Sequence, residues 1–328
     1  MVPRRWPDTC LFYGNNDDSP MSRIFDALKQ ASRARQNGNR DTLEEDWDIL
    51  GTGEIRPSPT STSPGTNATD VLAVSQPVAD PWVISPEREQ HHHILDQHRT
   101  LGPTAQIALD QAARIIPNAA DAAVVEHYRR LRTKIMQQHA MKAFRSLLVT
   151  SASPQEGKTV TTLNIALSFA MIQSFRVLIV DGDLRRGSLG KWIGVADRPG
   201  LSNVIEGSAP LDEAVFSSEG FPMHFMVSGT SQLPAAELLH SANLSSHFQE
   251  MTKHFDLVLV DSPPVNLITD TQLLAANCDA VLLVARAFST TRKSFERAVQ
   301  DLAPFRVIGT VLNAGNRAHL YRRYKGYY

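Results

Sequence analysis

Residues 147–159 read Leu-Leu-Val-Thr-Ser-Ala-Ser-Pro-Gln-Glu-Gly-Lys-Thr, an apolar run that passes through a turn-forming segment into Gly-Lys-Thr. A strand, a loop and a helix that opens on Gly-Lys-Thr form the layout of a phosphate-binding P-loop. Gly157 allows the backbone to approach phosphate groups, and N–H groups at the start of the helix stabilise their negative charge. Lys158 is expected to reach the terminal phosphates, and the Thr159 hydroxyl is expected to bind Mg²⁺.

One residue departs from the P-loop pattern, whose first position is a glycine. That position holds Ala152 here. The other positions match, and the match falls between an expected strand and an expected helix. The residues expected to surround the nucleotide are Ser153, Pro154, Gln155, Glu156, Gly157, Lys158, Thr159 and Val160.

Two further apolar runs end in aspartates. Val177-Leu-Ile-Val leads into Asp181-Gly-Asp183, and Leu257-Val-Leu-Val leads into Asp261. Carboxylates two residues apart can share Mg²⁺ and orient an attacking hydroxyl, and a strand that ends in aspartate is the Walker B arrangement for Mg²⁺. Each aspartate alone also suits a turn that caps the next element. Because ligands bind at the carboxyl ends of strands in open α/β sheets, the three strand ends together predict one nucleotide site.

Strands and helices are expected to alternate after residue 120. Apolar, β-rich runs fall at 146–150, 176–180, 223–227, 256–260, 280–285 and 306–312, with helical patterns at 158–174, 235–252 and 290–303. Several of the runs are apolar almost throughout, which is typical of strands covered on both faces. The pattern predicts an α/β P-loop NTPase fold, with a mostly parallel sheet and helices on both faces.

The first third of the chain differs from the rest in composition and in hydrophobic pattern. Residues 1–20 carry no periodicity, whereas the pattern from Met21 places Ile24, Phe25 and Leu28 on one helical face, and Met21 is an alternative start. A segment rich in proline, serine and threonine follows, which buries too little apolar surface to order itself. We expect an N-terminal segment with a short amphipathic helix (1–40), a disordered linker (41–116), a P-loop domain (117–316) and a tyrosine-rich tail (317–328).

Composition excludes several classes of protein. The chain has 328 residues, with 33 Lys+Arg against 34 Asp+Glu and a net charge of −1. A nucleic-acid-coating protein favours a clear basic excess, so no nucleic-acid partner is expected. Cys10 and Cys278 are too few for a disulfide framework. No apolar run approaches the ~20 residues of a membrane helix, so a soluble, cytoplasmic protein is expected.

Tyrosine is concentrated at the C-terminus. The chain has six tyrosines, and those of the tail are Tyr321, Tyr324, Tyr327 and Tyr328. They alternate with Arg322, Arg323 and Lys325, a composition that suits a flexible tail better than a core. Packing of these rings on the domain or on a neighbouring molecule is the alternative.

The three strand ends and the tail together resemble the bacterial tyrosine kinases of polysaccharide export, over about 120–328. The resemblance implies that Lys158 and Thr159 bind the phosphates and Mg²⁺ of ATP. It also implies that Asp181 assists the acceptor tyrosine hydroxyl, while Asp183 and Asp261 complete the metal site. Gln155 departs from the glycine that many members have at its position, and Gly187 departs from their usual proline.

The resemblance extends to assembly. Glu126, Arg129 and Arg132 match the family's E-x-x-R-x-x-R oligomerisation element, although i,i+3 ion pairs on a surface helix explain the same spacing. The resemblance implies a ring-like homo-oligomer whose tail tyrosines are phosphorylated in trans. It also implies that the protein controls exopolysaccharide or capsule synthesis and export, and that it docks on a separate membrane-anchored activator. A cytoplasmic location peripheral to the inner membrane follows from the last of these.

Two other classes share parts of this pattern. A ParA/MinD-like positioning or assembly ATPase has the same fold and strand ends, but its members usually carry a second lysine five residues before the P-loop lysine, where this chain has Ser153. They also lack a tyrosine-rich tail. A scaffold with a degenerate nucleotide site is favoured by Ala152 and Gln155 and disfavoured by the intact lysine and aspartates.

Overall fold

The computed structural model describes residues 10–14, 102–105, 107, 122–195, 197–218 and 221–314. The expected amphipathic helix after Met21, most of the expected linker and the whole tyrosine tail lie outside these residues. The fold and the site below are those of the described parts.

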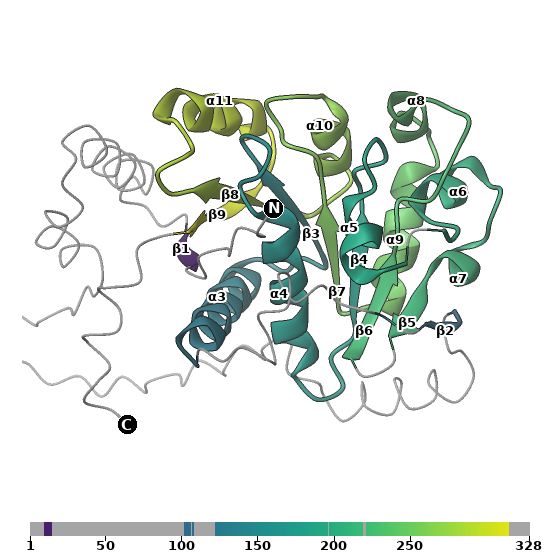
Figure 1. Ribbon diagram of the computed structural model, residues 1–328, viewed down its shortest axis with the longest axis horizontal. Helices are drawn as coiled ribbons and strands as arrows, with labels where there is room; N and C mark the ends of the chain where they lie inside the picture. The colour runs from purple at the N-terminus through teal and green to yellow at the C-terminus, as the bar shows by residue number, and fades with distance from the viewer. Residues whose placement is uncertain are drawn as a thin grey trace, which may run out of the picture.

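Within the described ranges, nine strands form one sheet in the order β1-β9-β8-β3-β7-β4-β6-β5-β2 (Figure 1). The strands are β1 (Cys10–Gly14), β2 (Thr104–Ala105), β3 (Ser146–Ser151), β4 (Val177–Asp181), β5 (Phe216–Ser218), β6 (Phe221–Met226), β7 (Leu257–Asp261), β8 (Ala280–Arg286) and β9 (Val307–Asn313). Neighbours pair in parallel, except β1 with β9 and β5 with β6. The predicted mostly parallel sheet is confirmed.

Helices cover both faces of this sheet, as predicted. The described helices are α3 (Ala122–Met141), α4 (Lys158–Ala170), α5 (Ser188–Ile193), α6 (Leu201–Glu206), α7 (Leu211–Ala214), α8 (Ala235–Leu239), α9 (Leu244–His254), α10 (Asp270–Ala275) and α11 (Arg292–Leu302). The first three pack on one face and the other six on the opposite face (Figure 1). Along β3, Leu147 and Val149 enter the first core and Leu148 enters the second, which explains the unbroken apolar run.

The helix that follows the P-loop is buried from Thr159 to Ala170, because α4 lies between the sheet and α3. Three of its polar side chains, Thr162, Asn164 and Ser168, donate to the backbone of the same helix. Thr162 Oγ1 donates to Lys158 O at 2.9 Å, and Asn164 Nδ2 donates to Val160 O at 2.7 Å. Such back-bonding lets polar residues occupy a buried helix without unpaired groups.

The element boundaries differ from the sequence prediction in three helices. The helix expected at 235–252 is two helices, α8 and α9, because serine and asparagine at Ser241 and Asn243 favour turns and caps over a helix interior. The helix expected at 158–174 ends at Ala170. The helix expected at 290–303 covers Arg292–Leu302, with Thr291 Oγ1 accepting from Ser294 N at 3.2 Å as its N-cap.

Two edge strands come from segments where the sequence indicates no regular structure. β1 lies in the region without periodicity and pairs Cys10 with Asn313 through Gly14 with Gly309. β2 lies inside the expected linker and pairs with β5. An edge strand pairs through main-chain hydrogen bonds, which any residue except proline can make, so its sequence gives little indication of the strand. The sheet therefore extends beyond the expected 117–316 domain.

Strand order brings the three chemically active strand ends together. β7 lies between β3 and β4, with Val149 opposite Asp261 on one side and Asp181 opposite Asp261 on the other. The P-loop, Asp181 and Asp261 consequently emerge at the same edge of the sheet, as the sequence predicts.

Candidate functional site

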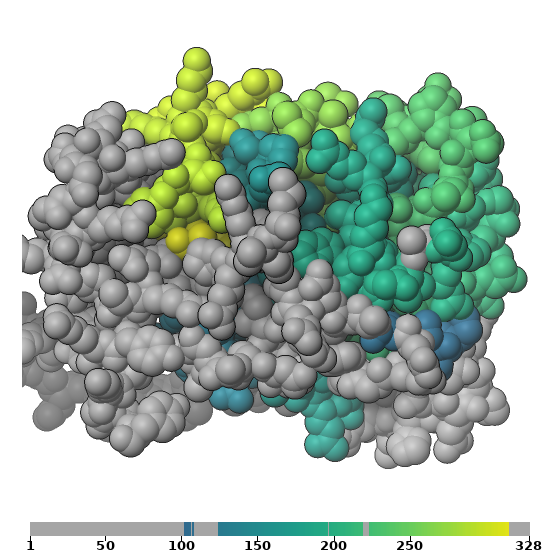
Figure 2. Space-filling model, in the orientation of Figure 1, coloured from purple at the N-terminus to yellow at the C-terminus, as the bar shows by residue number. Residues whose placement is uncertain are grey.

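The P-loop joins β3 to α4 and lies at the surface between α11 and the segment after β4, in dark teal at the upper centre of Figure 2. Gln155 has a φ of 62° and Gly157 a φ of 90°, so both occupy the left-handed region. A side chain at Gly157 would place its Cβ 2.1 Å from Asn313 Nδ2. Glycine is therefore required at 157 by both backbone and packing, whereas Gln155 is held in a conformation that L residues seldom adopt.

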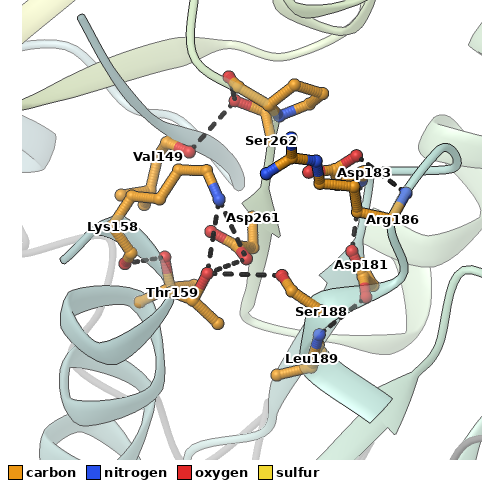
Figure 3. A network of polar contacts seen from close by, with 12 residues as sticks. Val149, Lys158, Thr159, Asp181, Asp183, Arg186, Ser188, Leu189, Asp261 and Ser262 are labelled. Atoms are coloured by element: carbon orange, nitrogen blue, oxygen red, sulfur yellow. Dashed lines mark hydrogen bonds and ion pairs between the residues drawn. The ribbon is translucent and has the colours of Figure 1, made fainter. Parts of the chain in front are cut away.

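Three predicted residues meet at the start of α4 (Figure 3). Thr159 Oγ1 donates to Asp261 Oδ2 at 2.6 Å, and Lys158 Nζ lies 3.9 Å from the same oxygen. Ser188 Oγ, at the start of α5, lies 3.5 Å from Thr159 Oγ1. The cluster joins a cation, two hydroxyls and a carboxylate at the helix N-terminus, where phosphate is favoured.

The residues present fit a Mg²⁺ ion. Asp261 is fully buried, and its Oδ1 has no hydrogen-bond partner in the described part of the chain. Burial raises the pKa of this carboxyl, while the Lys158 ammonium acts in the opposite direction. The described residues contain no cluster of three or more His, Cys, Asp or Glu suited to a metal. Mg²⁺ in nucleotide sites takes one or two protein ligands and completes its shell with phosphate and water.

The two aspartates at the end of β4, Asp181 and Asp183, have different surroundings. Asp181 is fully buried, and its carboxylate accepts from Leu189 N at 2.8 Å and from Asp183 N at 3.1 Å (Figure 3). Burial, with the nearby Asp261 charge, raises the pKa of Asp181 to about 7. Asp183 is 3% exposed, and its Oδ1 accepts from Arg186 N at 3.2 Å.

The raised pKa of Asp181 predicts how stability depends on pH in the absence of nucleotide and metal. The carboxyl binds a proton in the folded chain up to about pH 7 and releases it near pH 4 when unfolded, so the free energy of unfolding falls as pH rises between these values. We expect a decrease of about 2–3 kcal/mol between pH 5 and pH 7 from this group. Asp181→Asn is expected to remove this pH-dependent decrease in the free energy of unfolding.

Urea unfolding in EDTA across this pH range measures the effect. The relevant quantity is the dependence of the free energy of unfolding on pH in the wild type minus that in Asp181→Asn, which isolates Asp181 together with its coupling to Asp261. Asp212→Asn, at an exposed position of α7, is the matched control. Parallel profiles for wild type and Asp181→Asn would contradict the prediction.

A cavity of about 390 Å³ opens at these strand ends. The sequence-predicted residues that line it are Pro154, Gln155, Gly157, Lys158, Thr159, Val160 and Asp183. The cavity lining does not include Ser153, Glu156, Asp181 or Asp261. Sequence reasoning missed Trp192, Leu267 and Ile268, which form part of an apolar wall. Their positions follow from the short helices and turns after β4 and β7, which no periodic pattern signals.

Two arginines, Arg185 and Arg186, come shortly after Asp183, and both line the cavity. Arg185 donates to both oxygens of the buried Asp270, with Nε at 2.6 Å and Nη2 at 3.0 Å. A two-point contact between guanidinium and carboxylate fixes orientation as well as distance. This pair ties the loop after β4 to α10.

The expected oligomerisation residues lie on α3, which packs against α4. Arg129 is exposed and Glu126 is partly exposed, with 4.0 Å between Glu126 Oε2 and Arg129 Nη1. Arg132 Nη1 instead donates to the backbone oxygen of Ser168 in α4 of the same chain. Two of the three side chains are therefore available at the surface, and the third holds α3 to the helix that carries Lys158. Among the helices of the described ranges, none is both long and apolar enough for a membrane crossing.

Comparison with known proteins places this site in a family. The model of the AAA domain matches residues 155–300. Tyrosine-protein kinase YwqD of Bacillus subtilis is 30% identical over 205 residues, covering 62% of this chain and 85% of its own. Putative tyrosine-protein kinase CapB of Staphylococcus aureus is 29% identical over 192 residues, covering 58% and 84%.

Solved structures agree with these relatives. The kinase domain of the Escherichia coli tyrosine kinase ETK is 28% identical with a TM-score of 0.58, covering 68% of this chain and 87% of that one. The P-loop, the aspartates at the end of β4 and the aspartate at the end of β7 occupy one edge of a sheet with this shared architecture. On this evidence the chain belongs to the bacterial tyrosine-protein kinases, as its strand-end motifs predict.

Proposed function

We propose that this chain is an ATP-dependent protein-tyrosine autokinase that phosphorylates its own C-terminal tyrosines in trans. The observation that carries the proposal is the meeting of Lys158, Thr159 and Asp261 beside a cavity of nucleotide size, in a chain of this family that ends in four closely spaced tyrosines. ATP is the phosphoryl donor, and Tyr321, Tyr324, Tyr327 and Tyr328 are the acceptors.

Each residue of the site then has a defined task. Lys158 neutralises charge on the terminal phosphates, and Thr159 with Asp183 and Asp261 holds Mg²⁺, which supplies charge stabilisation when bound. The tyrosine oxygen forms a bond to the γ-phosphorus as the bond from that phosphorus to the β–γ bridging oxygen breaks, which releases ADP. Asp181, at the end of β4 beside Asp183, is assigned to take up the proton of the hydroxyl, which is the role that the family resemblance gives it.

The described chain ends close to the site. β9 ends at Asn313, whose Nδ2 donates to Glu156 O in the P-loop at 3.2 Å. The 14 residues after Ala314 can extend roughly 50 Å, enough to enter the cavity of an adjacent subunit. We assign Glu126 and Arg129 to the contact between subunits of a ring-like oligomer, with Arg132 supporting α3 from within the chain.

The cellular role proposed is control of exopolysaccharide or capsule synthesis and export. Each phosphate brings about −1.5 to −2 charges to a tail whose neighbouring residues are basic, so phosphorylation reverses its sign. We propose that this change shifts the balance between assembled and separate subunits. A separate membrane-anchored protein is the proposed activator, and it would hold the kinase at the inner face of the membrane.

Phosphosite mapping after incubation with ATP and Mg²⁺ tests the kinase function directly. We expect phosphotyrosine at the C-terminal cluster and none at Tyr128, which is 2% exposed in α3. The alternative is a ParA/MinD-like ATPase, and hydrolysis of ATP without any tail phosphotyrosine would favour it. Ser153, in place of that class's second lysine, argues for the kinase.

A further inference from the structure

The P-loop of this chain holds a residue with a side chain in a conformation that suits glycine. Gln155 adopts a φ of 62°, whereas Ala152, at the first glycine position, is not among the residues with a positive φ. A left-handed conformation costs a residue with a side chain about 1–2 kcal/mol. Contacts from outside the loop must therefore stabilise it, and residues that do not line the cavity provide them.

Glu156 is the centre of these contacts. Its side chain is 2% exposed, although it belongs to a surface loop. One carboxylate oxygen accepts from Ser153 N at 3.0 Å and thereby bridges the loop. The other accepts from Thr290 Oγ1 at 2.6 Å, on the segment between β8 and α11. A buried carboxylate with donors on both oxygens is fixed in position, because losing either donor leaves it poorly compensated.

Two further side chains reach the loop backbone from the ends of neighbouring strands. Arg286 Nη1, at the end of β8, donates to Gln155 O at 2.9 Å. Asn313 Nδ2, at the end of β9, donates to Glu156 O at 3.2 Å. Thr290 Oγ1 also accepts from Arg286 N at 2.7 Å, so the residues that contact Glu156 and Gln155 from the β8 side are hydrogen-bonded to each other.

We propose that Glu156, Thr290, Arg286 and Asn313 form a clamp that holds the P-loop in its nucleotide-binding conformation before nucleotide arrives. They are positioning residues for the phosphates of a nucleoside triphosphate. Glu156 and Thr290 act from outside the cavity, since neither lines it. The clamp offsets the cost of the left-handed conformation at Gln155. It rests on the proposed function, in that nucleotide must bind at this loop.

The clamp predicts a particular kind of defect. When only a fraction of molecules hold the binding conformation, the apparent dissociation constant rises by the inverse of that fraction. Once ATP is saturating, the bound loop is ordered in every molecule, so turnover is unchanged. Weakening the clamp is therefore expected to raise KM for ATP and the dissociation constant for ADP while kcat stays the same.

Thr290→Val tests this with Thr290→Ser as the matched control. Valine keeps the shape and removes the hydroxyl, whereas serine keeps the hydroxyl. We expect Thr290→Val to weaken Mg·ADP binding by about tenfold, the equivalent of one hydrogen bond to a charged group. Thr290→Ser should stay near wild type. Isothermal titration with Mg·ADP, together with KM and kcat for ATP, gives the readouts.

Each result decides between distinct conclusions. Thr290→Val with wild-type ADP affinity, or with equal losses in the valine and serine variants, would overturn the clamp. If Thr290→Val does not fold, Thr290→Ala, which also removes the hydroxyl, is measured by the same criteria against the same serine control. A wild-type protein that binds no nucleotide would instead refute the proposed function.

Discussion

Lys158→Met is expected to abolish both ATP turnover and tyrosine phosphorylation. Lys158 begins α4, is largely buried beside the cavity and directs its Nζ toward Asp261 at 3.9 Å. Replacing it removes a positioned cation from the site where phosphate charge develops. Loss of one such stabilising group lowers turnover by about 10²–10³-fold. Steady-state ATP hydrolysis and phosphotyrosine formation by the purified protein measure the effect.

The matched control is Lys142→Met, which removes an exposed lysine that follows α3. It should retain wild-type activity. Thermal unfolding of both variants separates loss of charge from loss of fold, since Lys158 also compensates the buried Asp261 carboxylate. A folded Lys158→Met protein with more than a tenth of wild-type turnover would remove this residue from the phosphate site.

Local sequence was sufficient to predict the chemical centre of the site because each motif lies at the end of one strand. Leu147 to Val149, and the apolar run before Asp261, are buried on both faces, so their patterns are unambiguous. Parallel pairing then brings Asp181 opposite Asp261 without any further information. The strand order therefore brings the three strand-end motifs together at one edge of the sheet.

The supporting contacts could not be predicted in the same way. Thr290 lies 134 residues from Glu156 in the chain, and Asn313 lies 157 residues from it. Threonine in a loop and asparagine at the end of a strand each suit a local turn, so neither carries a sign of a distant partner. The partners become apparent only when β8 and β9 are placed beside β3.

The same limit applies to Arg132. Its spacing from Glu126 and Arg129 indicates one helical face. In the folded chain, however, Arg132 donates to Ser168 O of α4, while the other two remain at least partly exposed. Helical periodicity identifies residues that share a face but not which of them the neighbouring helix covers. An oligomerisation test on this helix is therefore cleaner at Glu126 and Arg129 than at Arg132.

Two variants that cannot phosphorylate their own tails are expected to restore tail phosphorylation when mixed. One protein carries Lys158→Met with an intact tail, and the other carries phenylalanine at Tyr321, Tyr324, Tyr327 and Tyr328 with an intact site. Neither labels its own tail. If the tail of one subunit enters the cavity of another, the mixture incubated with ATP and Mg²⁺ should place phosphotyrosine on the Lys158→Met chain. A size tag on that chain identifies the labelled protein by mass spectrometry.

A recipient that combines Lys158→Met with the four phenylalanines is the control, and it should remain unlabelled. Only Tyr13 and Tyr128 are left in that chain, so any label on it would reveal acceptors outside the tail. The active partner must hydrolyse ATP at the wild-type rate, which shows that the phenylalanine tail leaves the site intact. A mixture without label, alongside a wild-type protein that labels its tail, would mean that each chain phosphorylates itself, and transfer between molecules would be excluded.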